Sequence, residues 1–218
     1  MKHLSIVCTT AALVAVLAVA VLPNVARAQN LIQNSGFESG GANWTFLNSV
    51  VPDQYIDYGM TPTPAFGTED AVFNAGDQTP SGVLSQSFAT IPGANYTVSF
   101  VYGNFNANTS AGTQTVTAEA IDTNTAALLG SVVASDTAPG IQTSFAAVMD
   151  TTFTFGFTAT GANTTLRFTD SPASQTISSD GILDNVSVVA VVPEAGTLAL
   201  VAAGIAVGVG LVRRKPAA

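Results

Sequence analysis

The chain has one cysteine, one histidine and six basic residues, and nearly all of them lie close to its two ends. Between Gln29 and Val192 there is no cysteine, no histidine and no lysine, and Arg167 is the single basic residue. This inventory excludes disulfides, Ser-His-Asp hydrolysis, cysteine and lysine nucleophiles, and zinc sites built on His or Cys in that interval. Carboxylate chemistry is what remains, either as paired acids for glycoside hydrolysis or as oxygen ligands for calcium.

The same interval is strongly acidic. It holds thirteen of the fourteen Asp and Glu residues, and against one arginine they give a side-chain charge of about −12. Nucleic acid and anionic lipid surfaces are therefore expected to be poor partners, because their phosphates would meet a repulsive field. Neutral glycans, cations and other proteins are compatible with this charge.

The N-terminus has the layout of a secretory signal peptide. Lys2 precedes an apolar stretch at residues 4–22, and Ala26 and Ala28 form a small-x-small cleavage site. We expect residues 1–28 to form a signal helix that is removed on export across the inner membrane, so that the mature chain begins at Gln29. An uncleaved N-terminal anchor is the alternative.

The C-terminus has the layout of a transmembrane segment. An uncharged run of 17 residues at 196–212 is followed by a basic cluster at 213–215. As a helix the run would reach roughly 25 Å, the short end of what spans a bilayer. The cations are expected to remain cytoplasmic, which places the preceding domain on the far side of the membrane. A buried core helix is the alternative.

Residues 192–218 resemble the PEP-CTERM sorting signal of exported bacterial proteins. The resemblance rests on the motif Pro193, Glu194 and Ala195, on the helix, and on the basic residues Arg213, Arg214 and Lys215. Ala195 departs from the family, which usually has proline there. The resemblance implies an exosortase-like processing enzyme as partner, an anchorage in the membrane that is transient or stable, and delivery to the cell surface or extracellular matrix.

The interior reads as β-strands. Tyr96, Val98, Phe100 and Tyr102 alternate with smaller or polar residues, which is typical of a sheet with one buried face. Many short strands separated by Gly, Asn, Pro and Ser turns predict an all-β sandwich over residues 29–191. Further strands are expected around Val116–Ala120, Phe153–Phe157 and Leu166–Phe168, and at Trp44–Val51, Ala71–Phe73, Val83–Phe88, Leu128–Val133, Thr143–Val148 and Ile182–Val189.

Two short segments resemble galactose-binding-like jelly rolls, a group that includes several carbohydrate-binding modules. The opening segment 30–40 contains Asn-Ser-Gly-Phe-Glu and is followed by Trp44, and the closing segment 181–188 contains Leu-Asp-Asn-Val-Ser-Val. The resemblance implies a jelly-roll β-sandwich. It specifies the fold better than the ligand.

The same resemblance implies a structural calcium ion held by Glu38 and Asp184. An independent argument concerns Asp184: if Val186 and Val188 face the core, alternation turns Asp184 inward too. A buried carboxylate must be paired or bound to a cation, and Arg167 is the only basic side chain available. The alternative is that Glu38 is a solvated turn residue and that Asp184 is bonded to backbone N–H groups.

Aromatic rings are the usual platforms for sugars. Trp44 is one candidate, although its position also suits a core residue. Tyr55 and Tyr58 lie in a more polar, loop-like stretch and are the better candidates, with ordinary loop packing as the alternative.

The leading hypothesis is a non-catalytic, surface-sorted protein that binds extracellular polysaccharide or belongs to the extracellular matrix. A carboxylate glycosidase is one alternative; Glu69, Asp70 and Glu119 are available, but no spacing selects a catalytic pair. A purely structural or adhesive coat protein is the other.

Overall fold

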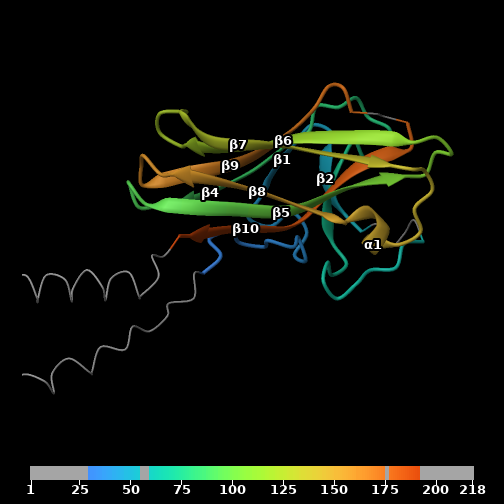
Figure 1. The fold of residues 1–218 in the computed structure, drawn as a ribbon, viewed down its shortest axis with the longest axis horizontal. Coiled ribbons are helices and arrows are strands. Elements are labelled where there is room, and N and C mark those ends of the chain that lie inside the picture. The colour runs from blue at the N-terminus through green and yellow to red at the C-terminus, as the bar shows by residue number, and fades with distance from the viewer. Residues whose placement is uncertain (1–28, 55–58, 175–176, 192–218) are drawn as a thin grey trace, which may run out of the picture. The chain divides into compact units, whose positions relative to one another are not determined.

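The computed structural model describes residues 29–54, 59–174 and 177–191 (Figure 1). The signal peptide, the sorting tail, Tyr55 and Tyr58 lie outside these ranges, so what the sequence predicts for them stays a prediction. Within the described ranges, no helix has the length and apolar composition needed to cross a bilayer.

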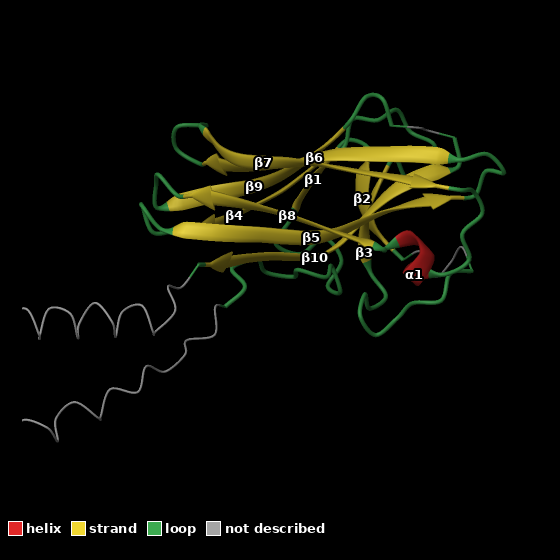
Figure 2. Cartoon of the chain, viewed as in Figure 1, coloured by secondary structure: helices red, strands yellow, loops and turns green. Residues whose placement is uncertain are grey.

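The described domain is all-β, as the sequence predicts. Figure 2 shows two layers of strands, which are two antiparallel sheets of five strands each. The first sheet has the order β1 (Thr45–Leu47), β4 (Val83–Ala89), β9 (Asn163–Asp170), β6 (Gly112–Asp122), β7 (Leu128–Ala138). The second has the order β2 (Val50–Asp53), β3 (Asp70–Phe73), β10 (Ser179–Ala190), β5 (Asn95–Asn106), β8 (Thr151–Thr158). The chain changes sheet at every connection except β2–β3 and β6–β7.

The main core lies between the sheets and follows the alternation seen in the sequence. Tyr96, Val98, Phe100 and Tyr102 of β5 are all buried, and so are the inward residues of β6 and β9. The ring of Phe100 meets that of Phe168 from the first sheet edge-on, with centroids 5.0 Å apart. Burial of these alternate side chains is the main force that holds the two sheets together.

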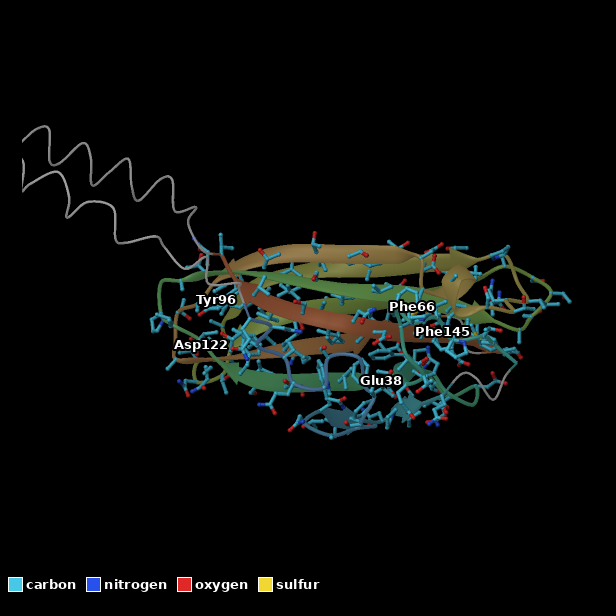
Figure 3. All side chains as sticks on the ribbon, turned by 90° about the horizontal axis from the view of Figure 1, so that it is seen from below. Glu38, Phe66, Tyr96, Asp122 and Phe145 are labelled. Atoms are coloured by element: carbon cyan, nitrogen blue, oxygen red, sulfur yellow. The ribbon has the colours of Figure 1, made fainter. Side chains whose placement is uncertain are left out.

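A second apolar cluster covers the outer face of the second sheet. It includes Phe145 and Val148 of α1 (Phe145–Val148), packed against Ile182 and Val72. Figure 3 shows Phe66 and Phe145 close together at the end of the sandwich that lies away from Tyr96 and Asp122. The helix lies so close to the sheet that a Cβ atom on Gly103 would overlap the carbonyl oxygen of Val148.

Two strand predictions are wrong. The segment 143–148 contains α1, because its two apolar side chains lie three residues apart and dock on one face. The segment 44–51 divides into β1 and β2 because Asn48 takes a positive φ of 62°, which turns the chain from the first sheet to the second.

Candidate functional site

Trp44 is a core residue, which corrects its prediction as a sugar platform. The residue is 7% exposed, and the centroid of its ring lies 5.2 Å from that of Phe37. Its indole N–H donates to the carbonyl of Asn34 at 3.0 Å, so the polar atom that a buried tryptophan must satisfy is bonded within the opening turn. No ring face remains for a ligand.

Glu38 is an exposed residue of the opening turn, and its carboxylate holds the segment just before β3. Its Oε1 accepts hydrogen bonds from the backbone N–H groups of Thr68 and Glu69 at 3.0 and 3.1 Å. Its Oε2 accepts a third from the Thr68 hydroxyl at 3.1 Å. Glu38 therefore ties the first segment of the domain to the second sheet.

Asp184 and Asp70 form a pair of buried acids on adjacent strands. They lie one step beyond the Leu183–Ala71 pair of the antiparallel register between β10 and β3, and Asp53 of β2 is opposite Asp70 on the other side. Asp70 and Asp184 are both fully buried. Asp184 Oδ1 accepts from the N–H of Asn185 at 2.6 Å, whereas Asp184 Oδ2 and both oxygens of Asp70 have no hydrogen-bond partner.

Burial makes both carboxyls weak acids. It raises the pKa of Asp184 to about 8, with a further contribution from the charge of Glu38 and an opposing one from the N–H of Asn185. Burial also raises the pKa of Asp70 well above its usual range, and the charges of Asp184, Asp53, Glu69 and Glu38 add to the effect. The acids thus share one electrostatic environment.

No basic side chain of the described domain balances this environment. Arg167, the one basic residue between Gln29 and Val192, lies on β9 of the first sheet, where its Nη2 contacts Glu119 Oε2 at 2.8 Å. The side chains of Asp70 and Asp184 therefore need either protons or a bound cation to be stable when buried.

The donor set suits a hard cation such as calcium, which takes carboxylate and carbonyl oxygens. The orphaned oxygens of Asp70 and Asp184 are the observation on which this fit rests. Within the described ranges, no three His, Cys, Asp or Glu side chains are gathered into a ready metal site. Asp70 is a buried acid that the sequence predictions did not include among the candidate ligands. Alternation along its strand places it on the face of Val72, outside the main core, and gives no signal that it is buried.

A different polar surface lies on the outer face of the first sheet. A groove of about 430 Å³ there is lined by Thr115, Thr117, Glu119, Val133, Arg167, Thr169, Asp170, Ser171 and Pro172. Hydroxyl pairs cross from β6 to β7 beside it, Thr115 with Ser135 and Thr113 with Thr137, each at 2.8 Å. The Nε and Nη2 atoms of Arg167 both donate to Glu119 Oε2, at 3.1 and 2.8 Å, which fixes a charged pair among the hydroxyls.

The exposed large apolar side chains within the described ranges are Leu, Ile and Val, with no aromatic ring among them. The three acids considered for glycoside hydrolysis are not brought together. Glu119 is paired with Arg167 on the first sheet, Asp70 is buried in the second, and Glu69 is hydrogen-bonded to Gln54.

No protein-family model and no curated protein matches the sequence. Among solved structures, the chain is similar to a xylan-binding domain from Paenibacillus barcinonensis, with 12% identity, 76% of this chain and 97% of that chain covered, and a TM-score of 0.46. A family 16 carbohydrate-binding module has 17% identity, covers 73% of this chain and 99% of its own, and has a TM-score of 0.44. The enzymatically active domain of the bacteriophage CBA120 tailspike protein 4 has 12% identity, 74% of this chain covered and a TM-score of 0.46, and the present chain spans about a fifth of its length.

Proposed function

We propose that this protein is an exported, non-catalytic β-sandwich that binds extracellular polysaccharide on the outer face of its first sheet. The observation that carries the proposal is the groove beside the Arg167–Glu119 pair, where hydroxyl, carboxylate and guanidinium groups line one open surface. Such groups can exchange hydrogen bonds with sugar hydroxyls, and both members of the pair are held in place before a ligand arrives. The alternation of strands between the sheets supports a jelly-roll topology for the domain.

Glycan-array binding of the purified protein tests this proposal. Arg167→Ala removes the charged donor at the centre of the groove, and because a hydrogen bond to a charged group is worth about 1.5–3 kcal/mol, affinity should fall by roughly tenfold to a hundredfold. Thr154→Ala on the exposed face of β8, in the other sheet, is the matched control and should bind normally. Equal binding by both variants would place the ligand elsewhere, and an array without any positive glycan would leave the coat-protein hypothesis. Release of reducing sugar would instead identify a glycosidase.

We propose further that the tail directs the domain to the cell surface through an exosortase-like enzyme. Its motif, apolar run and basic end support this proposal. Changing both Pro193 and Glu194 to Ala should leave the protein in the membrane fraction when cells are fractionated. Unaltered processing and surface delivery would refute the sorting role, whereas the apolar run could still serve as a plain anchor.

Calcium is proposed as a structural ion at the opening turn. Asp70 and Asp184 would hold it, with Glu38 beside them, and its positive charge would balance the two buried carboxylates. In this proposal, the residues join the first segment of the domain to β3 and β10, so that the ion stabilises the fold and takes no part in chemistry.

A further inference from the structure

One end of the sandwich gathers three turns and the last described residue. The register pairs Ala190 with Tyr96, Asn95 with Thr158, Ala89 with Asn163, and Asp122 with Thr164, so the turns 89–95, 122–128 and 158–163 lie together beside Val191. We call this surface the Val191 end. Figure 3 shows Tyr96 and Asp122 at this end, away from Phe66 and Phe145.

Hydrogen bonds join the turns into one unit. The N–H groups of Thr90 and Gly93 donate to the carbonyls of Ala162 and Ala159 at 2.9 and 2.8 Å. The N–H of Val191 donates to the carbonyl of Asn95 at 2.8 Å. The exposed side chains of this end are therefore held in fixed positions relative to one another.

The Val191 end exposes no charged side chain, although the side chains of the domain sum to a charge of about −12. Asp122 is its only charged residue, and it is 2% exposed. Its Oδ1 accepts from the N–H groups of Asn124 and Thr125 at 3.0 Å, and its Oδ2 accepts from the Thr160 hydroxyl at 2.5 Å. The carboxylate is thus turned inward, where it closes the turn.

The same end exposes large apolar side chains. Ile91 is 70% exposed, Leu128 58% and Val191 54%. A shallow groove of about 380 Å³ connects the region of Leu129 with Val191, and its lining residues, among them Asn95, Tyr96 and Phe157, are all uncharged. The acids Asp136 and Asp150, by contrast, lie at the opposite ends of their strands, near Ile141.

We propose that the Val191 end lies against the lipid surface of the membrane while the tail spans it. This inference rests on the proposed insertion of the tail. Four residues, 192–195, separate Val191 from the start of the uncharged run at Gly196, and the five Cα–Cα steps between these two positions span at most roughly 18 Å when fully extended. β10 therefore ends close to the bilayer, and the surface around it must face the lipid.

The distribution of charged side chains determines which surface of the domain can face the lipid. Electrostatic repulsion between acids and anionic headgroups acts over about 8 Å at physiological ionic strength. An end without an exposed acidic side chain meets less of that repulsion, and Ile91, Leu128 and Val191 can enter the interface as apolar anchors. The expectation that anionic lipid repels this protein then holds for the rest of its surface and not for the Val191 end.

Site-directed spin labelling of the full chain tests the inference. With Cys8 changed to Ser, single cysteines at positions 91, 128 and 141 are labelled, and the protein is reconstituted into phosphatidylcholine vesicles containing phosphatidylglycerol. Labels at 91 and 128 should be protected from a water-soluble nickel complex and accessible to oxygen, while the label at 141 stays accessible to nickel. Ile91→Asp should abolish the protection at 128. Ile141→Asp changes an apolar position at the other end that is 60% exposed, against 70% for Ile91, and should leave the protection intact.

The outcomes separate this inference from the proposal beneath it. Protein that floats with the vesicles but shows equal nickel accessibility at all three positions would overturn the inference and leave tail insertion standing. Protein that does not float would refute insertion of the tail and the inference with it. Protection that appears only in native membranes, and not in pure lipid, would assign the surface to a protein partner and overturn the lipid assignment.

Discussion

Removal of calcium should destabilise the domain, and substitution of the buried acids should remove that response. The perturbation is EDTA, compared with millimolar calcium, on a chain trimmed to residues 29–191, which keeps both sheets complete. A ligand that binds only the folded state stabilises it by RT ln(1 + [L]/Kd), which is about 2.7 kcal/mol at a hundredfold excess over Kd. For a domain of this size, that free energy corresponds to a shift in Tm of about 5–10 °C.

The variants Asp70→Asn and Asp184→Asn should each abolish the calcium response. Each also removes a buried carboxyl that has no basic partner within the described domain, so the variants should match or exceed the unaltered protein in EDTA. Asp150→Asn is the matched control, because Asp150 is an exposed acid bonded to the Thr151 hydroxyl at 2.8 Å, and its melts should respond to calcium normally.

Intrinsic fluorescence of the buried Trp44 is a suitable readout, since it reports the packing between the opening turn and the core. Coincident melts of the unaltered protein in calcium and in EDTA would show that no calcium ion stabilises the domain. The buried acids would then be neutral carboxyl groups, and Glu38 would act only through its hydrogen bonds to Thr68 and Glu69.

Two further changes test the packing. Burial raises the pKa of Asp170 to about 6, although the hydrogen bond from the Ser174 hydroxyl lowers it. The carboxyl of Asp170 therefore binds a proton more tightly in the folded state than in the unfolded state. The unfolding free energy should therefore fall as pH rises from about 4 to about 6. Urea melts at several pH values should show that Asp170→Asn removes this contribution to the pH dependence, and the same pH dependence in the variant and the unaltered protein would contradict the prediction. Gly103→Ala should lower the unfolding free energy by about 1–3 kcal/mol or more by displacing α1, whereas Gly156→Ala, with ordinary contact space, should change it little.

The strands were predictable because their cause is local. A residue such as Phe100, flanked by Ser99 and Val101, is placed on a buried face by period-two alternation alone, and the structure buries it. The helix α1 was not predictable in this way, because its four residues are too few to show a helical period. It is fixed instead by the close approach to Gly103, a contact between segments that are distant in the sequence.

The acid site was predictable only in part. The burial of Asp184 was predicted, but the reason given for it is wrong. The register shifts between Asp184 and Ser187, so Asp184 lies on the face of Ile182 and not on the core face of Val186 and Val188, and Gly36 of the opening turn lies against it. Asp70 comes beside it only through the register of β3 against β10, which no spacing along the chain reveals. The prediction of Trp44 as a sugar platform is wrong because proximity to a turn does not determine whether a ring points outward. The hydrogen bond from its indole N–H to the carbonyl of Asn34 holds the ring in the inward position.

The scarcity of cations has opposite consequences at different places in this domain. At the acid site, the absence of a nearby basic residue leaves Asp70 and Asp184 without balance, so a metal ion or protons must complete the structure. At the Val191 end, the ionised form of the only acid, Asp122, is stabilised by hydrogen bonds from Thr160, Thr125 and Asn124 instead of by a counter-charge, and these bonds lower its pKa. A domain with one arginine thus has two ways to retain a buried carboxylate.

Hydrogen bonds suffice for Asp122 at a turn, where backbone N–H groups are unpaired. Within a sheet most of those groups are committed to neighbouring strands. On β3 and β10 only Asp184 Oδ1 accepts such a bond, from the N–H of Asn185, and the remaining oxygens of Asp70 and Asp184 need either protons or a cation.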